Sequence, residues 1–147
     1  MQSMTNEIQT ELEALAARNG GVLSVHAVVE AAEPEDSVLH DWFEWDDGEA
    51  AALWRLEQAR QLIRVAVTVI DRPDTKPVEV RTFVSLPSDR HAGGYRLTVR
   101  CLEDSDLRGE MLADALRELN RLRAKYQTLK ELAPVFRALD KLEKKAS

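Results

Sequence analysis

The chain has 147 residues, of which 44% are hydrophobic and 31% are charged, and its formal net charge is −6 at pH 7. This composition predicts a soluble globular protein with its own core, and no apolar run approaches the ~20 residues that cross a bilayer. The lone Cys101 excludes an internal disulfide and the N-terminus lacks a signal pattern, so we expect a cytoplasmic protein without a membrane segment.

Charge is distributed unevenly along the chain. Residues 1–49 hold twelve acidic side chains and one basic one, whereas residues 50–100 hold nine basic and five acidic ones. The overall negative charge argues against a basic protein that coats nucleic acid without sequence specificity, because such binding depends on positive side chains that neutralise phosphates. The local excess of positive charge suits a DNA-binding surface, while the acidic front half needs no role beyond solubility.

Two helices are predicted in the first third of the chain. The first spans residues 4–18, ends at Asn19-Gly20-Gly21, and has its apolar residues on one face: Met4, Ile8, Leu12 and Leu15. Ser24 would cap a second helix over residues 24–33, which Pro34 would end. The valines of this segment suit a strand equally well, but its alanines and the serine cap favour a helix.

An acidic, aromatic-rich connection follows over residues 34–47. It is longer than the turn of three or four residues in a compact helix-turn-helix, and a helical turn from Ser37 to Phe43 could fill part of it. We expect its large apolar side chains to lie in the core rather than to stack on bases, because the neighbouring carboxylates would repel phosphate: Leu39, Trp42, Phe43 and Trp45.

Residues 48–64 are predicted to form the central helix. Asp46 and Glu49 have the spacing of a capping box at its start. One face is apolar and is expected to be core: Ala52, Leu53, Leu56, Ala59, Leu62 and Ile63. The other face carries long side chains that donate hydrogen bonds to phosphates and base edges: Arg55, Gln58, Gln61 and Arg64.

The hydrophobic period then changes to that of β-strands. Residues 65–70 and 78–84 form two β-rich runs around the loop DRPDTKP, and residues 95–102 alternate as a third strand. Short loops predict one three-stranded antiparallel sheet from these runs. Since a helix followed by a hairpin is the second half of a winged helix-turn-helix, the expected fold class is α+β, with a winged-helix-like domain over residues 1–86.

Residues 87–147 are expected to hold the third strand and a long helical segment for packing or dimerisation. From Leu107 a heptad spacing continues for about twenty-five residues, until Pro134 breaks the helix near Leu132 and a short helix over residues 135–145 folds back. The seam could pack on its own domain or on a second copy. Its predicted oligomerisation residues are Leu112, Leu119, Leu122, Tyr126 and Leu129.

The sequence contains no phosphate-binding loop, nucleophile elbow or zinc-protease motif, so we expect neither an enzyme nor a cofactor. His40 with Asp41 and Glu44 could be drawn as a metal or acid-base site, but solvated carboxylates explain these residues better and no metal is expected. A hydrolase or nuclease around His40 is a minor alternative. Cys101 is expected to be a small core residue rather than a nucleophile.

Two sequence patterns carry a resemblance. Leu39 to Ala50 reads LH-x2-FEWDD-x-x-A, and Leu56 to Arg64 reads L-x-Q-A-R-x-LIR. With most of the remaining chain, these segments resemble a set of uncharacterised small proteins encoded in bacteriophages and prophages. The resemblance implies a phage context in a bacterial host cell and assigns no catalytic or binding residue.

The leading hypothesis is a phage-encoded winged-helix protein that binds duplex DNA as a homodimer, in a regulatory or packaging role. The central helix would enter the major groove, and the DNA-binding residues would be Arg55, Gln58, Gln61, Arg64, Arg72 and Lys76. The alternative is a protein-interaction or virion-assembly protein that binds a host or phage protein on the same scaffold without DNA. The acidic front half and the long connection favour this alternative.

Overall fold

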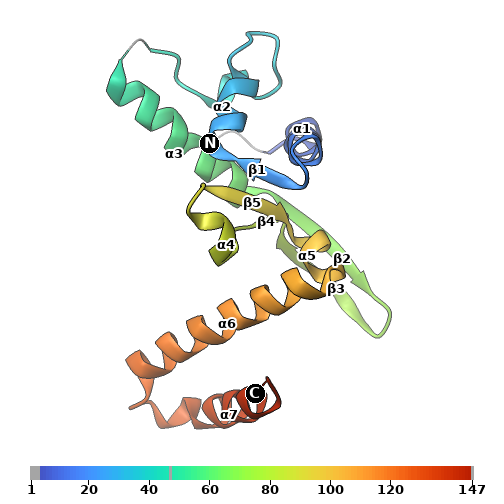
Figure 1. Cartoon of the computed structure of the whole chain (residues 1–147), viewed down its shortest axis with the longest axis vertical. Helices are drawn as coiled ribbons and strands as arrows, with labels where there is room; N and C mark the ends of the chain where they lie inside the picture. The colour runs from blue at the N-terminus through green and yellow to red at the C-terminus, as the bar shows by residue number, and fades with distance from the viewer. Residues whose placement is uncertain (1–3, 47, 147) are drawn as a thin grey trace. The chain divides into compact units, whose positions relative to one another are not determined.

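The computed structural model describes residues 4–46 and 48–146 (Figure 1). The chain divides into two units, Met1–Glu103 and Asp104–Ser147, whereas the sequence suggested a boundary after residue 86. The difference arises because strands on either side of residue 86 pair in one sheet. As the predicted α+β class requires, helices accompany small antiparallel sheets, and a long helix lies in the second unit. Within the described residues, no helix is long and apolar enough to cross a membrane.

The first unit alternates short helices and strands. Its elements are α1 (Asn6–Arg18), β1 (Val22–Ser24), α2 (Val25–Ala32), the 3-10 turn η1 (His40–Trp42), α3 (Glu49–Val65), β2 (Val67–Arg72), β3 (Thr75–Arg81), β4 (Phe83–Val84), α4 (Pro87–Arg90), β5 (Gly94–Leu97) and α5 (Thr98–Glu103). All three helices predicted before residue 65 are confirmed. Ser24 caps α2 as expected, since its hydroxyl accepts a hydrogen bond from the Ala27 amide at 3.1 Å.

The core of the first unit lies among α1, α2, α3 and the connection between α2 and α3. Its fully buried side chains include Leu12, Leu23, Val28, Leu39, Leu62 and Ile63. In the connection, Phe43 is also buried, and Trp42 and Trp45 pack against the core. The prediction that these aromatic residues are core is therefore confirmed.

The start of α3 differs from the predicted capping box. Gly48 is the N-cap residue and no side chain caps the helix there. Asp47 lies outside the described residues. The apolar face is buried only in the second half of α3, at Ala59, Leu62 and Ile63, whereas Leu53 near its start is exposed.

The strands form two sheets instead of the predicted single one. The hairpin β2–β3 stands as a two-stranded sheet, and the three-stranded antiparallel sheet has the order β1-β5-β4. Leu23 pairs with Tyr95, and Phe83 pairs with Leu97. A Cβ atom on Gly94 would lie 2.8 Å from Cγ1 of Val22, so β1 and β5 approach closely only because this position is glycine.

The third predicted strand, over residues 95–102, is wrong in its second half. The chain leaves the strand at Thr98, whose hydroxyl donates to the Arg81 carbonyl at 2.6 Å and whose amide donates to the Thr82 carbonyl at 2.9 Å. Helix α5 begins there and buries Thr98 and Cys101 on one side. Residues three positions apart share a helix face, so the burial of Thr98 and Cys101 fits a helix. The alternation of apolar and polar residues over this segment predicts a strand instead. Cys101 is buried, as expected for a small core residue.

The second unit is a pair of helices joined by a short connection. Its elements are α6 (Ser105–Tyr126), the 3-10 turn η2 (Lys130–Leu132) and α7 (Ala133–Ala146). Asp104 caps α6 by accepting hydrogen bonds from the amides of Asp106 and Leu107, both at 3.0 Å. The separate last helix is confirmed. The long helix ends at Tyr126, earlier than predicted, so the heptad seam does not continue through Leu129 as one helix.

Candidate interaction surface on the third helix

The connection between α2 and α3 is held by a stack of side chains around Trp45. The rings of His40 and Trp45 are stacked with centroids 5.0 Å apart, and the guanidinium of Arg55 lies 5.2 Å from the Trp45 ring centroid on a cation-π contact. The indole N–H of Trp45 donates to the His40 carbonyl at 2.9 Å, and Nδ1 of His40 donates to the Ala32 carbonyl at 2.8 Å. These contacts fix the connection against the start of α3.

Two of the predicted DNA-binding residues hold this same connection. Arg55 donates from Nη1 to the carbonyls of Glu44 and Asp46, at 3.2 and 3.0 Å. Gln58 accepts a hydrogen bond from the Glu44 amide at 3.2 Å. Both side chains are half-buried and point to the chain's own backbone, so the expectation of a single outward face of four donors is wrong for these two.

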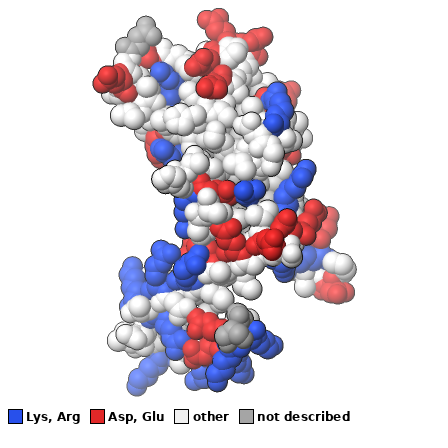
Figure 2. Space-filling view, in the orientation of Figure 1, with Lys and Arg blue, Asp and Glu red and all other residues white. Residues whose placement is uncertain are grey.

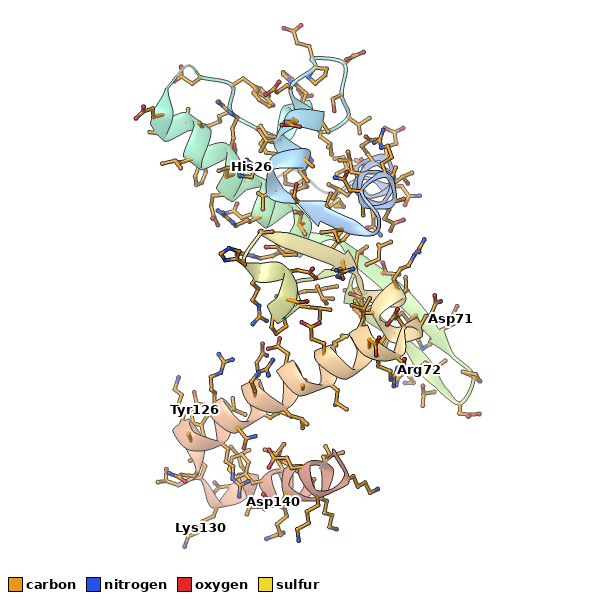
Figure 3. All side chains as sticks on the ribbon, in the orientation of Figure 1. His26, Asp71, Arg72, Tyr126, Lys130 and Asp140 are labelled. Carbon is orange, nitrogen blue, oxygen red and sulfur yellow. The ribbon has the colours of Figure 1, made fainter. Side chains whose placement is uncertain are left out.

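The other predicted DNA-binding residues are exposed. Gln61 and Arg64 lie at the end of α3, and Arg72 and Lys76 lie on the β2–β3 hairpin. Among the described residues, no ion pair joins Arg64, Arg72 or Lys76 to a carboxylate. The hairpin also carries Asp71, labelled beside Arg72 in Figure 3, together with Asp74 and Glu79. With Arg81, its basic residues equal its acidic residues in number, so the formal charge of the hairpin is zero.

The exposed side of α3 carries two large apolar residues that no sequence argument assigned to a surface. Leu53 is 68% exposed and Trp54 is 43% exposed. We call this pair the α3 patch. The angular position of Leu53 on the helix could have predicted its exposure. At 100° per residue, Leu53 lies about 120° around the helix from the buried Ala59, outside the buried stripe.

A groove of about 510 Å³ lies beside the α3 patch, between α2 and α3. We call it the α2–α3 groove. Figure 3 shows His26 between these two helices. The groove is lined by apolar residues of both helices and by polar or charged ones: Val29, Ala52, Leu53 and Leu56, then His26, Glu33, Glu49 and Arg55.

A second hollow, of about 340 Å³, shares Glu33 and Arg55 with the α2–α3 groove. Its other lining residues are Glu35, His40, Trp45 and Asp46. Figure 2 shows acidic side chains gathered near the top of the first unit, with uncharged surface between them. The α2–α3 groove is therefore mainly apolar, and the second hollow beside it is mainly polar, with the carboxylates of Glu33, Glu35 and Asp46.

No metal site is formed around His40. In the described part of the chain, no three His, Cys, Asp or Glu side chains lie close enough together to hold a metal ion. His40 itself is engaged by Trp45 and by the Ala32 carbonyl.

In the second unit, the predicted oligomerisation residues lie mostly at the surface. Leu112, Leu119, Leu122 and Leu129 are exposed, and Tyr126 is half-buried. The α6–α7 contact instead buries Phe136 and Leu139 and includes an ion pair of Arg123 with Asp140 at 2.6 Å. Asn120 also donates a hydrogen bond to Glu143 across the pair.

No protein-family model matches the sequence, and no curated protein or solved structure is significantly similar to it.

Proposed function

We propose that this chain is a protein-interaction protein whose first unit binds a partner through the α3 patch. The observation that supports this proposal most is the exposure of Leu53 and Trp54 on a helix that is otherwise anchored to the core. Large apolar side chains exposed next to each other beside a groove are typical of surfaces that bind protein. The adjoining carboxylates would repel the phosphates of nucleic acid.

The structure of the α2–α3 connection supports the same proposal. Nη1 of Arg55 and Oε1 of Gln58 are hydrogen-bonded to the backbone of residues 44–46. These contacts hold both side chains toward the chain's own connection, which disfavours their use at base edges. Recognition of a partner protein requires no displacement of the connection, because the α3 patch is already exposed.

The proposal is tested by quantitative affinity capture from extracts of bacteria, infected and uninfected. We expect a partner that wild-type protein retains and that Leu53→Asp loses at least tenfold, because the aspartate places a charge in the apolar contact. Val69→Asp is the matched control, since Val69 is 60% exposed on β2. Equal retention by Leu53→Asp and wild type would contradict the proposal.

Duplex DNA binding by a winged helix is the second candidate function. It is supported by the order α1, β1, α2, α3, β4, β5 with the sheet order β1-β5-β4, an order that a winged helix would require. In this interpretation β2–β3 is an insertion, the wing is the loop between β4 and β5, and Gln61 with Arg64 remain available to DNA. The proposal of a phage origin rests only on the resemblance of the two sequence patterns.

A titration of fluorescent duplex DNA at two salt concentrations tests the second candidate. Phosphate contacts predict an affinity that falls as salt rises, and a loss of about tenfold in Arg64→Glu. Arg18→Glu is the control for net charge, because Arg18 lies on α1 in an ion pair with Glu11. Absence of binding at low salt would contradict DNA binding.

We also propose that the second unit pairs two copies of the chain. Leu112, Leu119 and Leu122 expose apolar surface on α6, and Val135 and Leu142 expose more on α7. Sedimentation of Leu119→Asp combined with Leu122→Asp should show a monomer where wild type is a dimer. A folded variant that stays dimeric, or a monomeric wild type, would contradict this interface.

A further inference from the structure

The α2–α3 groove has apolar residues of both helices and two glutamates among its lining residues. Val29 of α2 faces Ala52 and Leu56 of α3 across it, and Leu53 stands at its edge. Glu33 follows the last residue of α2, and Glu49 is the first residue of α3. Both carboxylates are exposed, so they can meet a partner's charge without first being taken out of the core.

The one arginine among the lining residues of the groove offsets part of this acidity, and it stands against the two carboxylates of Glu33 and Glu49. The guanidinium of Arg55 donates to the carbonyls of Glu44 and Asp46 and lies on the ring of Trp45. It is therefore directed to the chain's own connection. On the other side of Arg55, the second hollow adds the carboxylate of Glu35.

We propose that the α2–α3 groove binds a positively charged amphipathic helix of a partner protein. The partner's apolar residues, three and four positions apart, would pack on Val29, Leu53 and Leu56, and its lysines or arginines would lie near Glu33 and Glu49. This inference rests on the proposed function and names the class of partner. These carboxylates disfavour nucleic acid and anionic lipid, which share a negative surface.

The proposed occupant is a helix of another protein rather than of a second copy of this chain. Helix α7 is basic, but its apolar residues Phe136 and Leu139 are buried against α6, so docking that face in the groove would expose the core of the second unit. Helix α6 exposes leucines, but its five basic and four acidic side chains nearly balance, so it lacks the excess of positive charge that Glu33 and Glu49 would attract.

The test is a fluorescence anisotropy titration of the full-length protein with a labelled synthetic peptide of about four helical turns. The peptide carries leucines at helical three- and four-residue spacing and lysines elsewhere. Its matched controls are a twin with glutamate in place of every lysine and a scrambled peptide of the same composition. The protein variants are Leu53→Asp, the double reversal Glu33→Lys with Glu49→Lys, and the control Val69→Asp.

We expect the lysine peptide to bind wild type and Val69→Asp equally, and to bind Leu53→Asp and the double reversal at least tenfold more weakly. The double reversal should gain affinity for the glutamate twin, a result that misfolding does not produce. Binding should also weaken as salt is raised. Equal binding of the lysine peptide, its twin and the scrambled peptide would overturn the inference, as would no binding to wild type at low salt.

The two failures are distinguishable. If affinity capture depends on Leu53 but the lysine peptide does not bind, the α3 patch binds protein and the class of partner is wrong. If capture is also independent of Leu53, the proposed function fails as well.

Discussion

At the scale of single residues, the two arginines of α3 have different roles. Arg55 bonds two carbonyls and contacts Trp45, whereas Arg64 is exposed. Arg55→Ala should lower the free energy of unfolding by about 1–2 kcal/mol, because two hydrogen bonds and a cation-π contact are lost at a half-buried site. Arg64→Ala should change it by less than about 0.5 kcal/mol.

Chemical denaturation followed by tryptophan fluorescence measures both changes. The emission of Trp45 should also shift in Arg55→Ala under native conditions, because the connection loses its anchor. Similar small effects for the two variants would show that Arg55 is not structural.

The role of Arg55 could not be predicted from the sequence. Helical periodicity placed Arg55 and Gln58 opposite the apolar stripe, and it carries no information on which segment packs beside the helix. The contact partner lies 9 to 14 residues earlier, in a connection with no regular period. The exposure of Leu53 differs in this respect, because its angle from Ala59 around the helix already places it outside the buried stripe.

At the scale of secondary-structure elements, the contact between β1 and β5 leaves little space for a side chain at position 94. Gly94→Ala would place a Cβ atom 2.8 Å from Cγ1 of Val22. We expect a loss of about 1–3 kcal/mol in the free energy of unfolding, typical of overpacking. The double variant Gly94→Ala with Val22→Ala should recover part of this loss, and a double-mutant cycle by urea denaturation measures the coupling. Additive effects would contradict the close approach.

The α6–α7 contact predicts a pH dependence. The pKa of Asp140 is lowered, chiefly by its hydrogen bond from Arg123 and further by the charges of Arg123 and Lys144. A lowered folded-state pKa stabilises the pair above the unfolded pKa of about 3.9, and this contribution is lost as pH falls through the folded pKa. The effect is small because solvent screens the pair: the side chain of Asp140 is 50% exposed and that of Arg123 is 35% exposed.

The corresponding variant is Asp140→Asn, measured by urea denaturation and circular dichroism between pH 7 and acid pH. Wild type should be the more stable at pH 7, and the difference should shrink toward zero below the unfolded pKa. Glu118→Gln removes an exposed carboxylate of α6 and should show no such trend. A difference that persists at acid pH would assign the stabilisation to packing instead of charge.

Elements with local signals were predicted well, and elements that depend on distant pairing were not. Ser24 and the glycines after α1 mark their helix ends in the sequence itself. The order β1-β5-β4 joins segments about seventy residues apart, and Thr98 ends β5 by bonding residues 81 and 82. No pattern within one segment specifies such partners.

At the scale of the whole molecule, the acidic front half and the α3 patch give the protein its proposed role. Eleven acidic residues precede α3, a twelfth is its first residue, and the outer side of the helix is apolar at Leu53 and Trp54. An anionic surface beside exposed apolar side chains favours positively charged proteins over nucleic acid. The proposed role therefore requires that a protein, rather than nucleic acid, contacts the start of α3.

The most direct measurement is site-specific photo-crosslinking in the bacterial cell, with a photoreactive amino acid in place of Trp54 and, as the control, in place of the exposed Ala17 on α1. We predict a discrete protein adduct from position 54 that Leu53→Asp abolishes, and no adduct of that size from position 17. Crosslinking of position 54 to DNA, or the same protein adducts from both positions, would contradict the account.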